Sequence, residues 1–186
     1  ATLTVVYTVV TDNGGTAGPS AFGLKVNGDS VSNSVPVALW AGSHNVSADG
    51  LSGYQASVWG GDCADNGSIN LDLGEHATCT ITHNDVAPTL RLLKTVINNN
   101  GGTETDPNAF GRRIDGVGVL HNAVNSLNAG NHTVSEDGLA GYVQGAWSPP
   151  CNPDGTVSLA VGQNATCSIT NDDVDTTSLT LVKQVI

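Results

Sequence analysis

Three polar residues in the second half of the chain lie on strand-like faces that are otherwise apolar. Lys94 alternates with the leucines that precede it. Glu136 follows Val134, and Asn171 follows Ile169, in each case by two positions. Side chains alternate between the two faces of a strand, so all three are predicted to point into an apolar interior. An amine, a carboxylic acid and a carboxamide would meet there, and these groups together can form an amide bond.

The chemistry of this set depends on desolvation. Burial disfavours the charged forms of an amine and of a carboxylic acid, which is expected to leave Lys94 as a neutral nucleophile beside a protonated Glu136. Lys94 could then attack the carboxamide carbon of Asn171 while Glu136 hydrogen-bonds the carboxamide and relays protons. Ammonia would leave, and an intramolecular isopeptide bond would remain. The alternative is a buried, unreacted ion pair between Lys94 and Glu136, in which both charges lose their hydration.

The four cysteines form two couples of equal spacing. Cys63 and Cys79 lie 16 positions apart, as do Cys151 and Cys167. Pairing within each couple predicts the disulfides Cys63–Cys79 and Cys151–Cys167, each contributing about 3 kcal/mol in the chain-entropy model. Disulfides persist in oxidising compartments, which places the protein outside the cytoplasm.

Metal sites are the weaker interpretation of the same segments. A zinc site would need histidines at ligand spacing beside the cysteines, and none is found there. The acidic turns at 62–66 and 152–154 could hold calcium, but neither has the full pattern of a calcium loop. We expect no metal and no cofactor.

Two copies of one pattern make up most of the chain. Two motifs recur, Asn-Gly-Gly at 13–15 and 100–102 and Asp-Gly-Leu-x-Gly-Tyr at 49–54 and 137–142. The cysteines recur with an offset of 88 (151 minus 63). The repetition predicts two homologous domains, residues 1–87 and 88–175.

Composition determines the fold class that these repeats are expected to have. Charged residues make up 12% of the 186 residues and aromatic residues 4%, and glycine is abundant with 23 residues, which favours short strands joined by turns. We therefore predict an all-β protein of two tandem immunoglobulin-like β-sandwich repeats. A net charge of -11 with six Lys and Arg argues against nucleic acid or an anionic membrane as a partner.

No apolar stretch is long enough to predict a membrane span. The chain opens at Ala1 on a strand-like pattern without a charged and apolar leader, so any signal peptide is expected to have been removed.

The end of the chain resembles the start of the second repeat. Residues 178–186 match residues 89–97 almost position for position. An isolated apolar strand cannot bury its face, so residues 176–186 are predicted to be either the first strand of a third repeat or a strand donated to a neighbouring subunit. The residues that would make this contact are Leu179, Leu181, Lys183 and Val185.

The residues of the second repeat resemble a known family. Lys94 lies in its first strand, the segment 135–142 reads Ser-Glu-Asp-Gly-Leu-Ala-Gly-Tyr, and Ile-Thr-Asn-Asp-Asp closes the domain at 169–173. This pattern resembles the prealbumin-like or CnaB-type (SpaA-like) domain of bacterial surface proteins and pilins. The resemblance implies a β-sandwich of about seven strands. For many members it also implies an intramolecular Lys–Asn isopeptide bond promoted by a Glu, the role that Glu136 would have.

The first repeat departs from this pattern at all three positions. Tyr7 stands in place of Lys94, Ala48 in place of Glu136, and His83 in place of Asn171. No isopeptide bond is expected there, and a hydrogen bond between Tyr7 and His83 is predicted instead.

These observations together predict a non-catalytic structural protein at a bacterial cell surface. It would be a building block of an extracellular filament, a pilus-like fibre or a repetitive stalk, with copies of itself or further repeats as partners. Enzymatic activity would be limited to a single self-directed cross-linking turnover. The alternative is an adhesin module that binds a glycan or a host protein through its loops, where an exposed Trp40 would offer a stacking surface.

Overall fold

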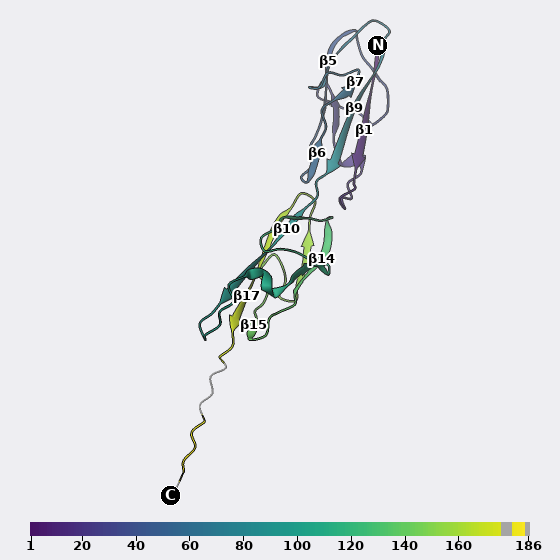
Figure 1. Cartoon of the computed structure of the whole chain (residues 1–186). Coiled ribbons are helices and arrows are strands. Elements are labelled where there is room, and N and C mark those ends of the chain that lie inside the picture. The colour runs from purple at the N-terminus through teal and green to yellow at the C-terminus, as the bar shows by residue number, and fades with distance from the viewer. Residues whose placement is uncertain (176–179, 185–186) are drawn as a thin grey trace. The chain divides into compact units, whose positions relative to one another are not determined.

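The computed structural model describes residues 1–175 and 180–184. The chain divides into two compact units, the first built mainly from Ala1–Thr89 and the second mainly from the residues that follow (Figure 1). The regular secondary structure of both units is almost entirely β-strand. In the part of the chain that the structure describes, no helix is long and apolar enough to span a membrane.

The first repeat is a two-sheet sandwich. Its elements in chain order are β1 (Thr2–Val10), the 3-10 helix η1 (Pro19–Ala21), β2 (Leu24–Val26), β3 (Asp29–Ser30), β4 (Val37–Ala38), β5 (Gly42–Ala48), β6 (Tyr54–Ala56), β7 (Gly60–Gly61), β8 (Ser68–Leu71) and β9 (His76–Asp85). One sheet has the order β4-β1-β9-β6, with β7 also paired to β9, and the other has the order β3-β2-β5-β8. The first and last strands run parallel, from Thr2 opposite His76 to Val10 opposite Asn84.

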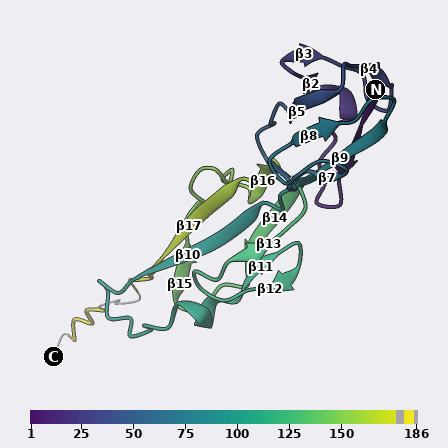
Figure 2. The same cartoon turned by 90° about the horizontal axis from the view of Figure 1, so that it is seen from above.

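The second repeat has the same architecture. Its elements are β10 (Thr89–Ile97), the 3-10 helix η2 (Pro107–Phe110), β11 (Arg112–Ile114), β12 (Val117–Gly118), β13 (Asn125–Ser126), β14 (Gly130–Glu136), β15 (Tyr142–Gln144), β16 (Thr156–Leu159) and β17 (Asn164–Asp173). The sheets have the orders β13-β10-β17-β15 and β12-β11-β14-β16 (Figure 2). This arrangement confirms the predicted all-β fold of two tandem sandwich repeats.

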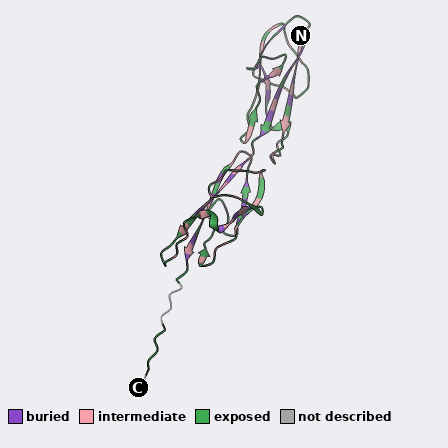
Figure 3. Ribbon diagram, viewed as in Figure 1, coloured by how far each residue is buried: buried purple, intermediate pink, exposed green. Residues whose placement is uncertain are grey.

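Strand alternation builds the core of each repeat. Along β9 and β17, buried residues alternate with more exposed ones over most of the strand (Figure 3). In the first repeat the inward residues of β1 are Leu3, Val5 and Tyr7, all at most 3% exposed. Because one face of each strand is buried, a shift of register by one residue would expose the whole apolar set, and the pairing is therefore well specified.

Short hairpins end in turns that only a few residue types can adopt. Asn27-Gly28 joins β2 to β3, and Asp115-Gly116 joins β11 to β12. All four residues have positive φ, between 50° and 90°. Two-residue hairpins favour such turns because their twist matches that of the flanking strands, and Asn, Asp and Gly tolerate positive φ best.

The segment at the end of the chain is described only over Thr180–Gln184. These five residues do not form a strand, and the side chain of Leu181 is 88% exposed. Lys183 is exposed as well, whereas Leu179 and Val185 lie outside the described residues. The sequence analysis predicted that this segment pairs with a strand of a third repeat or of a neighbouring subunit. Neither partner is part of the structure, so the pairing stays a prediction.

Candidate functional site

The second repeat brings Lys94, Glu136 and Asn171 into direct contact. Lys94 Nζ donates to Glu136 Oε2 at 2.5 Å, and Asn171 Nδ2 donates to Glu136 Oε1 at 2.6 Å. The side chains of Lys94 and Glu136 are fully buried, and Asn171 is 0% exposed. A single carboxylate therefore bridges the amine and the carboxamide in an interior without water contact.

The strand order explains how three distant residues meet. Lys94 on β10 and Asn171 on β17 belong to neighbouring strands of one sheet. Glu136 is the last residue of β14 in the opposite sheet, and its side chain reaches into the core between the two layers. The cluster thus joins the first and last strands of the repeat to the facing sheet.

The surroundings of Lys94 lower its pKa below that of a lysine in water. Burial lowers the pKa of Lys94, and the neighbouring Arg112 lowers it further, against the opposing effect of the Glu136 carboxylate. The amine also lies 4.2 Å from the centroid of the Phe110 ring. A neutral lysine in such surroundings is a nucleophile.

Only one of the two polar atoms of the Asn171 carboxamide has a hydrogen-bond partner among the residues described. Its nitrogen is bound to Glu136, while its Oδ1 atom is buried without a hydrogen-bond partner among the residues described. A buried acceptor without a donor costs about 1–3 kcal/mol.

A buried arginine that the sequence analysis did not single out completes the site. Arg112 on β11 is 1% exposed, and it lies directly opposite Glu136 in the antiparallel pairing of β11 with β14. Its Nη1 donates to the Pro107 carbonyl at 2.5 Å and its Nη2 to Asn108 Oδ1 at 2.9 Å. The alternation test could have found it, because Arg112 shares a strand face with the buried Ile114.

The equivalent interior of the first repeat is aromatic. The rings of Tyr7 and His83 stack with centroids 5.1 Å apart, and the Phe22 ring lies 5.0 Å from Tyr7 and 4.7 Å from His83. Burial raises the pKa of Tyr7, assisted by the nearby Tyr54. Burial also lowers the pKa of His83.

The hydrogen bond predicted between Tyr7 and His83 is not formed, and that prediction was wrong. The Tyr7 hydroxyl and His83 Nδ1 are both buried without a partner among the described residues. The Tyr7 and His83 rings stack with an angle of 25° between their planes, and both lie at tilted angles against the Phe22 ring. Aromatic contact area therefore takes the place of the polar cluster.

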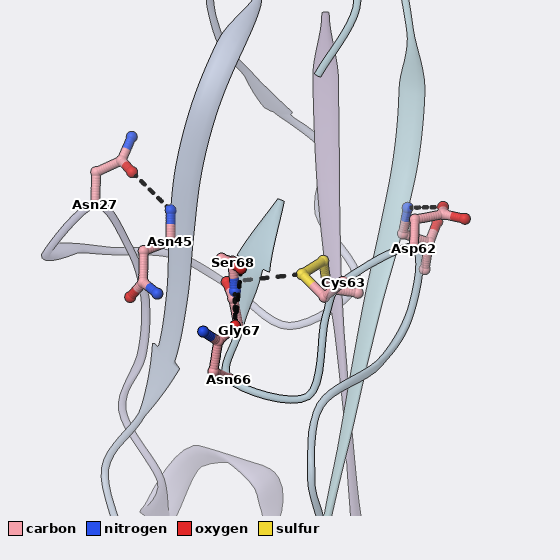
Figure 4. Close-up of a disulfide and its surroundings, with 9 residues drawn as sticks. Asn27, Asn45, Asp62, Cys63, Asn66, Gly67 and Ser68 are labelled. Carbon is pink, nitrogen blue, oxygen red and sulfur yellow. Dashed lines mark hydrogen bonds between the residues drawn. A yellow bond between two sulfur atoms is a disulfide. The ribbon is translucent and has the colours of Figure 1, made fainter. Parts of the chain in front are cut away.

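Each repeat contains one disulfide. Cys63 and Cys79 are joined with their Cα atoms 5.1 Å apart, and Cys151 and Cys167 with theirs 5.7 Å apart. Figure 4 shows the first of these bonds, where Cys63 in the segment before β8 is tied to β9. The bond fixes an otherwise irregular segment to the buried face of the last strand.

Carboxylates of the acidic turns are engaged with the backbone. Asp62 Oδ2 accepts from the Thr78 N–H at 2.7 Å, also visible in Figure 4, and Asp154 Oδ1 accepts from the Thr156 N–H at 2.9 Å. Within residues 1–175 and 180–184, no group of three or more His, Cys, Asp or Glu side chains is arranged to hold a metal ion.

The recurring Asn-Gly-Gly motif surrounds a buried carboxylate. Asp173 accepts hydrogen bonds from the backbone N–H groups of Asn99, Asn100 and Gly102, at 2.6–3.1 Å. A Cβ atom on Gly102 would lie 2.7 Å from both Asp173 Cβ and Tyr142 Oη, so only glycine fits here. The motif thus fastens the loop after the first strand to the end of the last strand.

The first repeat uses the same device. Asp85 accepts from the backbone N–H groups of Asn13 and Gly15, at 2.6–3.1 Å. Burial alone would raise the pKa of Asp85, but these hydrogen bonds outweigh it and hold the pKa below its ordinary value. The repeated motif therefore has a structural role that is independent of the Lys–Glu–Asn cluster.

Comparison with solved structures finds a similar fold in other proteins. The Bacillus anthracis TIE protein superposes with a TM-score of 0.52 and 16% identity, over 93% of this chain. This chain spans only 34% of that protein's length. The major pilin of Streptococcus pyogenes matches with a TM-score of 0.37 and 12% identity, over 92% of this chain and 97% of the pilin.

A third solved structure is similar to this chain, and the sequence comparisons identify its family. The minor pilin GBS52 of Streptococcus agalactiae has a TM-score of 0.32 and 12% identity, with 97% of this chain and 99% of the pilin covered. No curated protein sequence matches the chain significantly. The prealbumin-like fold domain family (SpaA_2) matches residues 1–81 and again residues 85–169. Because these two matches cover most of the chain, the protein belongs to the prealbumin-like fold domain family and carries two copies of that domain.

Proposed function

We propose that this protein is a structural building block of a bacterial extracellular filament, pilus-like fibre or surface stalk, braced by a covalent bond between Lys94 and Asn171. The observation that carries the proposal is the single carboxylate of Glu136, which contacts the Lys94 amine and the Asn171 carboxamide at 2.5 and 2.6 Å in a buried site. The family of the chain and its disulfides support the same role.

The bond would form by exchange of one amide for another. The neutral Lys94 amine attacks Asn171 Cγ, the bond from Cγ to Nδ2 breaks, and a new amide joins the two side chains. Glu136 accepts a proton from the attacking nitrogen and passes one to the departing nitrogen, which leaves as ammonia. Glu136 ends the reaction in the protonation state in which it began.

The position of the bond suits a protein under tension. Lys94 lies on β10 and Asn171 on β17, the first and last strands of the repeat. In a string of repeats, force enters through the first strand and leaves through the last. A covalent link between these strands bypasses the rest of the domain, so unfolding by force or by proteolysis becomes slow.

The disulfides support an extracellular location. Each repeat has one, and disulfides persist in oxidising environments. The partners of this chain would be further repeats or copies of itself, engaged through residues such as Leu181 and Lys183 near its end. A purified chain that stays monomeric at high concentration would favour a continuing array of repeats over strand donation.

One observation favours the adhesin as a second function. Trp40, in the segment between β4 and β5, is 89% exposed, which is unusual for a large aromatic residue. An exposed indole offers a flat apolar surface on which a sugar ring can stack. Binding of the protein to a glycan array that disappears in Trp40→Ala would support this function, and equal binding by both proteins would reject a role for Trp40.

Intact mass measured under reducing conditions tests the cross-link. The wild-type chain is expected to lack the mass of one ammonia, and Glu136→Gln and Lys94→Met are expected to show the full theoretical mass. Lys25→Met is the matched control, because Lys25 is a partly exposed lysine that pairs with Asp49 in the other repeat. A wild-type chain of full mass would reject the covalent brace.

A further inference from the structure

We propose that Arg112 is the fixed counter-ion of Glu136, which allows Lys94 to lose its proton and react inside the second repeat. This inference rests on the proposed Lys94–Asn171 bond and assigns a positioning residue to it. Arg112 touches neither of the two atoms that would be joined, so it acts through the charge of its guanidinium.

The geometry places Arg112 next to Glu136. The two residues are directly opposite each other on the antiparallel strands β11 and β14. Directly opposite residues project from the same face of a sheet, with Cβ atoms about 4.5–5.5 Å apart. Both side chains belong to the interior, since Arg112 is 1% exposed and the Glu136 side chain is fully buried.

The guanidinium is held in place from the other side. Its two Nη atoms donate to the Pro107 carbonyl and to the Asn108 side chain, both in the short helix η2. Its Nε atom is buried and has no hydrogen-bond partner among the residues the structure describes. The cation is therefore anchored by η2, on the strand that pairs with the strand of Glu136, and it forms no ion pair with Glu136 among the residues described.

Charge balance explains what this cation does. Lys94, Arg112 and Glu136 would leave one excess positive charge if all three were ionised in the buried interior. Arginine stays protonated in proteins, so the proton that leaves most readily is that of Lys94. With a neutral Lys94, the charges of the Arg112 guanidinium and the Glu136 carboxylate cancel, so no net charge is buried.

The other titratable groups near Lys94 lie at partly or fully exposed positions. His121, between β12 and β13, accepts the backbone N–H of Lys94 through Nδ1. Glu104, before η2, lines a cavity together with Lys94. The negative charge of Asp106 favours the protonated form of Arg112 and so raises its pKa, against the lowering by burial. Asn171 on β17 is uncharged, which leaves Arg112 and Glu136 as the buried charges that face the amine.

The first repeat shows that the fold does not need an arginine at this position. Leu24 on β2 lies opposite Ala48 on β5, in the register that pairs Arg112 with Glu136 in the second repeat. Leu24 is buried in the apolar core. Within one chain, the arginine is thus present where the Lys–Glu–Asn cluster is present and replaced by leucine where that cluster is missing.

The test follows bond formation during refolding of the full chain. Chains synthesised in a cell-free system are collected in denaturant and diluted into oxidising buffers over a series of pH values. Intact mass under reducing conditions then gives the fraction that has lost ammonia at each time. Arg112→Leu removes the charge, Arg112→Lys retains it, and Arg113→Leu is the control on the same strand, where Arg113 is partly exposed and paired with Asp137.

The expected result is a shift of the pH–rate profile. Without the guanidinium charge, the midpoint of Arg112→Leu should move upward by about one to two pH units, with at least a roughly tenfold slower reaction at neutral pH. Arg112→Lys should stay closer to the wild type, and Arg113→Leu should match it. A role limited to packing would slow the reaction without moving its midpoint.

The possible outcomes separate this inference from the proposed function. A folded Arg112→Leu chain with the wild-type midpoint would reject the role of Arg112 while the cross-link stands. A wild-type chain that loses no ammonia at any pH would reject the cross-link itself and this inference with it. If Arg112→Leu does not fold, as judged by circular dichroism, Arg112→Gln supplies the uncharged variant, because its amide keeps a polar group at the depth of the buried Arg112 Nε.

Discussion

Asn171 and His83 occupy equivalent positions on the last strands of the two repeats, and both are buried, but only Asn171 contacts a carboxylate. His83 instead stacks on an aromatic ring. One sandwich fold therefore supports two different interiors, a polar one arranged for a reaction and an aromatic one stabilised by packing. The difference between the two repeats of this chain provides an internal control for experiments on either.

The reactive cluster should be transferable to the first repeat. We expect a chain with Tyr7→Lys, Ala48→Glu, His83→Asn and Leu24→Arg to lose the mass of a second ammonia, because the backbone positions are equivalent. The same chain without Ala48→Glu should lose only one. A folded fourfold variant with a single loss would show that the positions alone are not sufficient for the bond.

The first disulfide should stabilise its own repeat. Replacing Cys63 and Cys79 together by Ala should lower the free energy of unfolding of the first repeat by about 3 kcal/mol, because the unfolded chain gains the freedom of the opened loop. Urea unfolding followed by the fluorescence of Trp59, which is buried in this repeat, measures the change. A lower free energy of unfolding of the second repeat, with that of the first unchanged, would contradict the prediction that this disulfide stabilises its own repeat.

His83 should make the first repeat sensitive to mild acid. Burial lowers the pKa of His83 in the folded state, so as the pH falls below the ordinary value of about 6.5 the unfolded chain takes up the proton first. Stability is therefore complete above that pH and declines below it. Urea midpoints measured from neutral to mildly acidic pH should fall for the wild type and change less for His83→Phe.

Asp85 should contribute a second loss of stability at lower pH. Hydrogen bonds from Gly15 and Asn13 hold its folded-state pKa below the ordinary value of about 4. Between these two values only the unfolded chain binds the proton, so stability is present above about pH 4 and is lost as the pH falls through the folded-state pKa. Asp85→Asn should lower the melting temperature at neutral pH by several degrees and flatten the acid dependence. An unchanged acid profile would show that these hydrogen bonds have no energetic role.

Some features of this protein were determined by the sequence alone. Strand alternation is a local property of the backbone, so the apolar neighbours of Lys94 and Asn171 were enough to predict that both point inward. The repeated motifs and the constant offset of the cysteines were likewise visible without coordinates, and they predicted two copies of one all-β domain.

The tertiary structure decided which inward residues meet. Lys94 and Glu136 are 42 positions apart, and their contact depends on the packing of two sheets that no local pattern encodes. The pairing of Arg112 with Glu136 depends in the same way on the register of β11 against β14. The stacking of Tyr7 on His83, beside Phe22 and in place of the predicted hydrogen bond, is likewise a contact between strands. Contacts of this kind are set by three-dimensional packing, because side-chain direction can be derived from the sequence of one strand but distance between strands cannot.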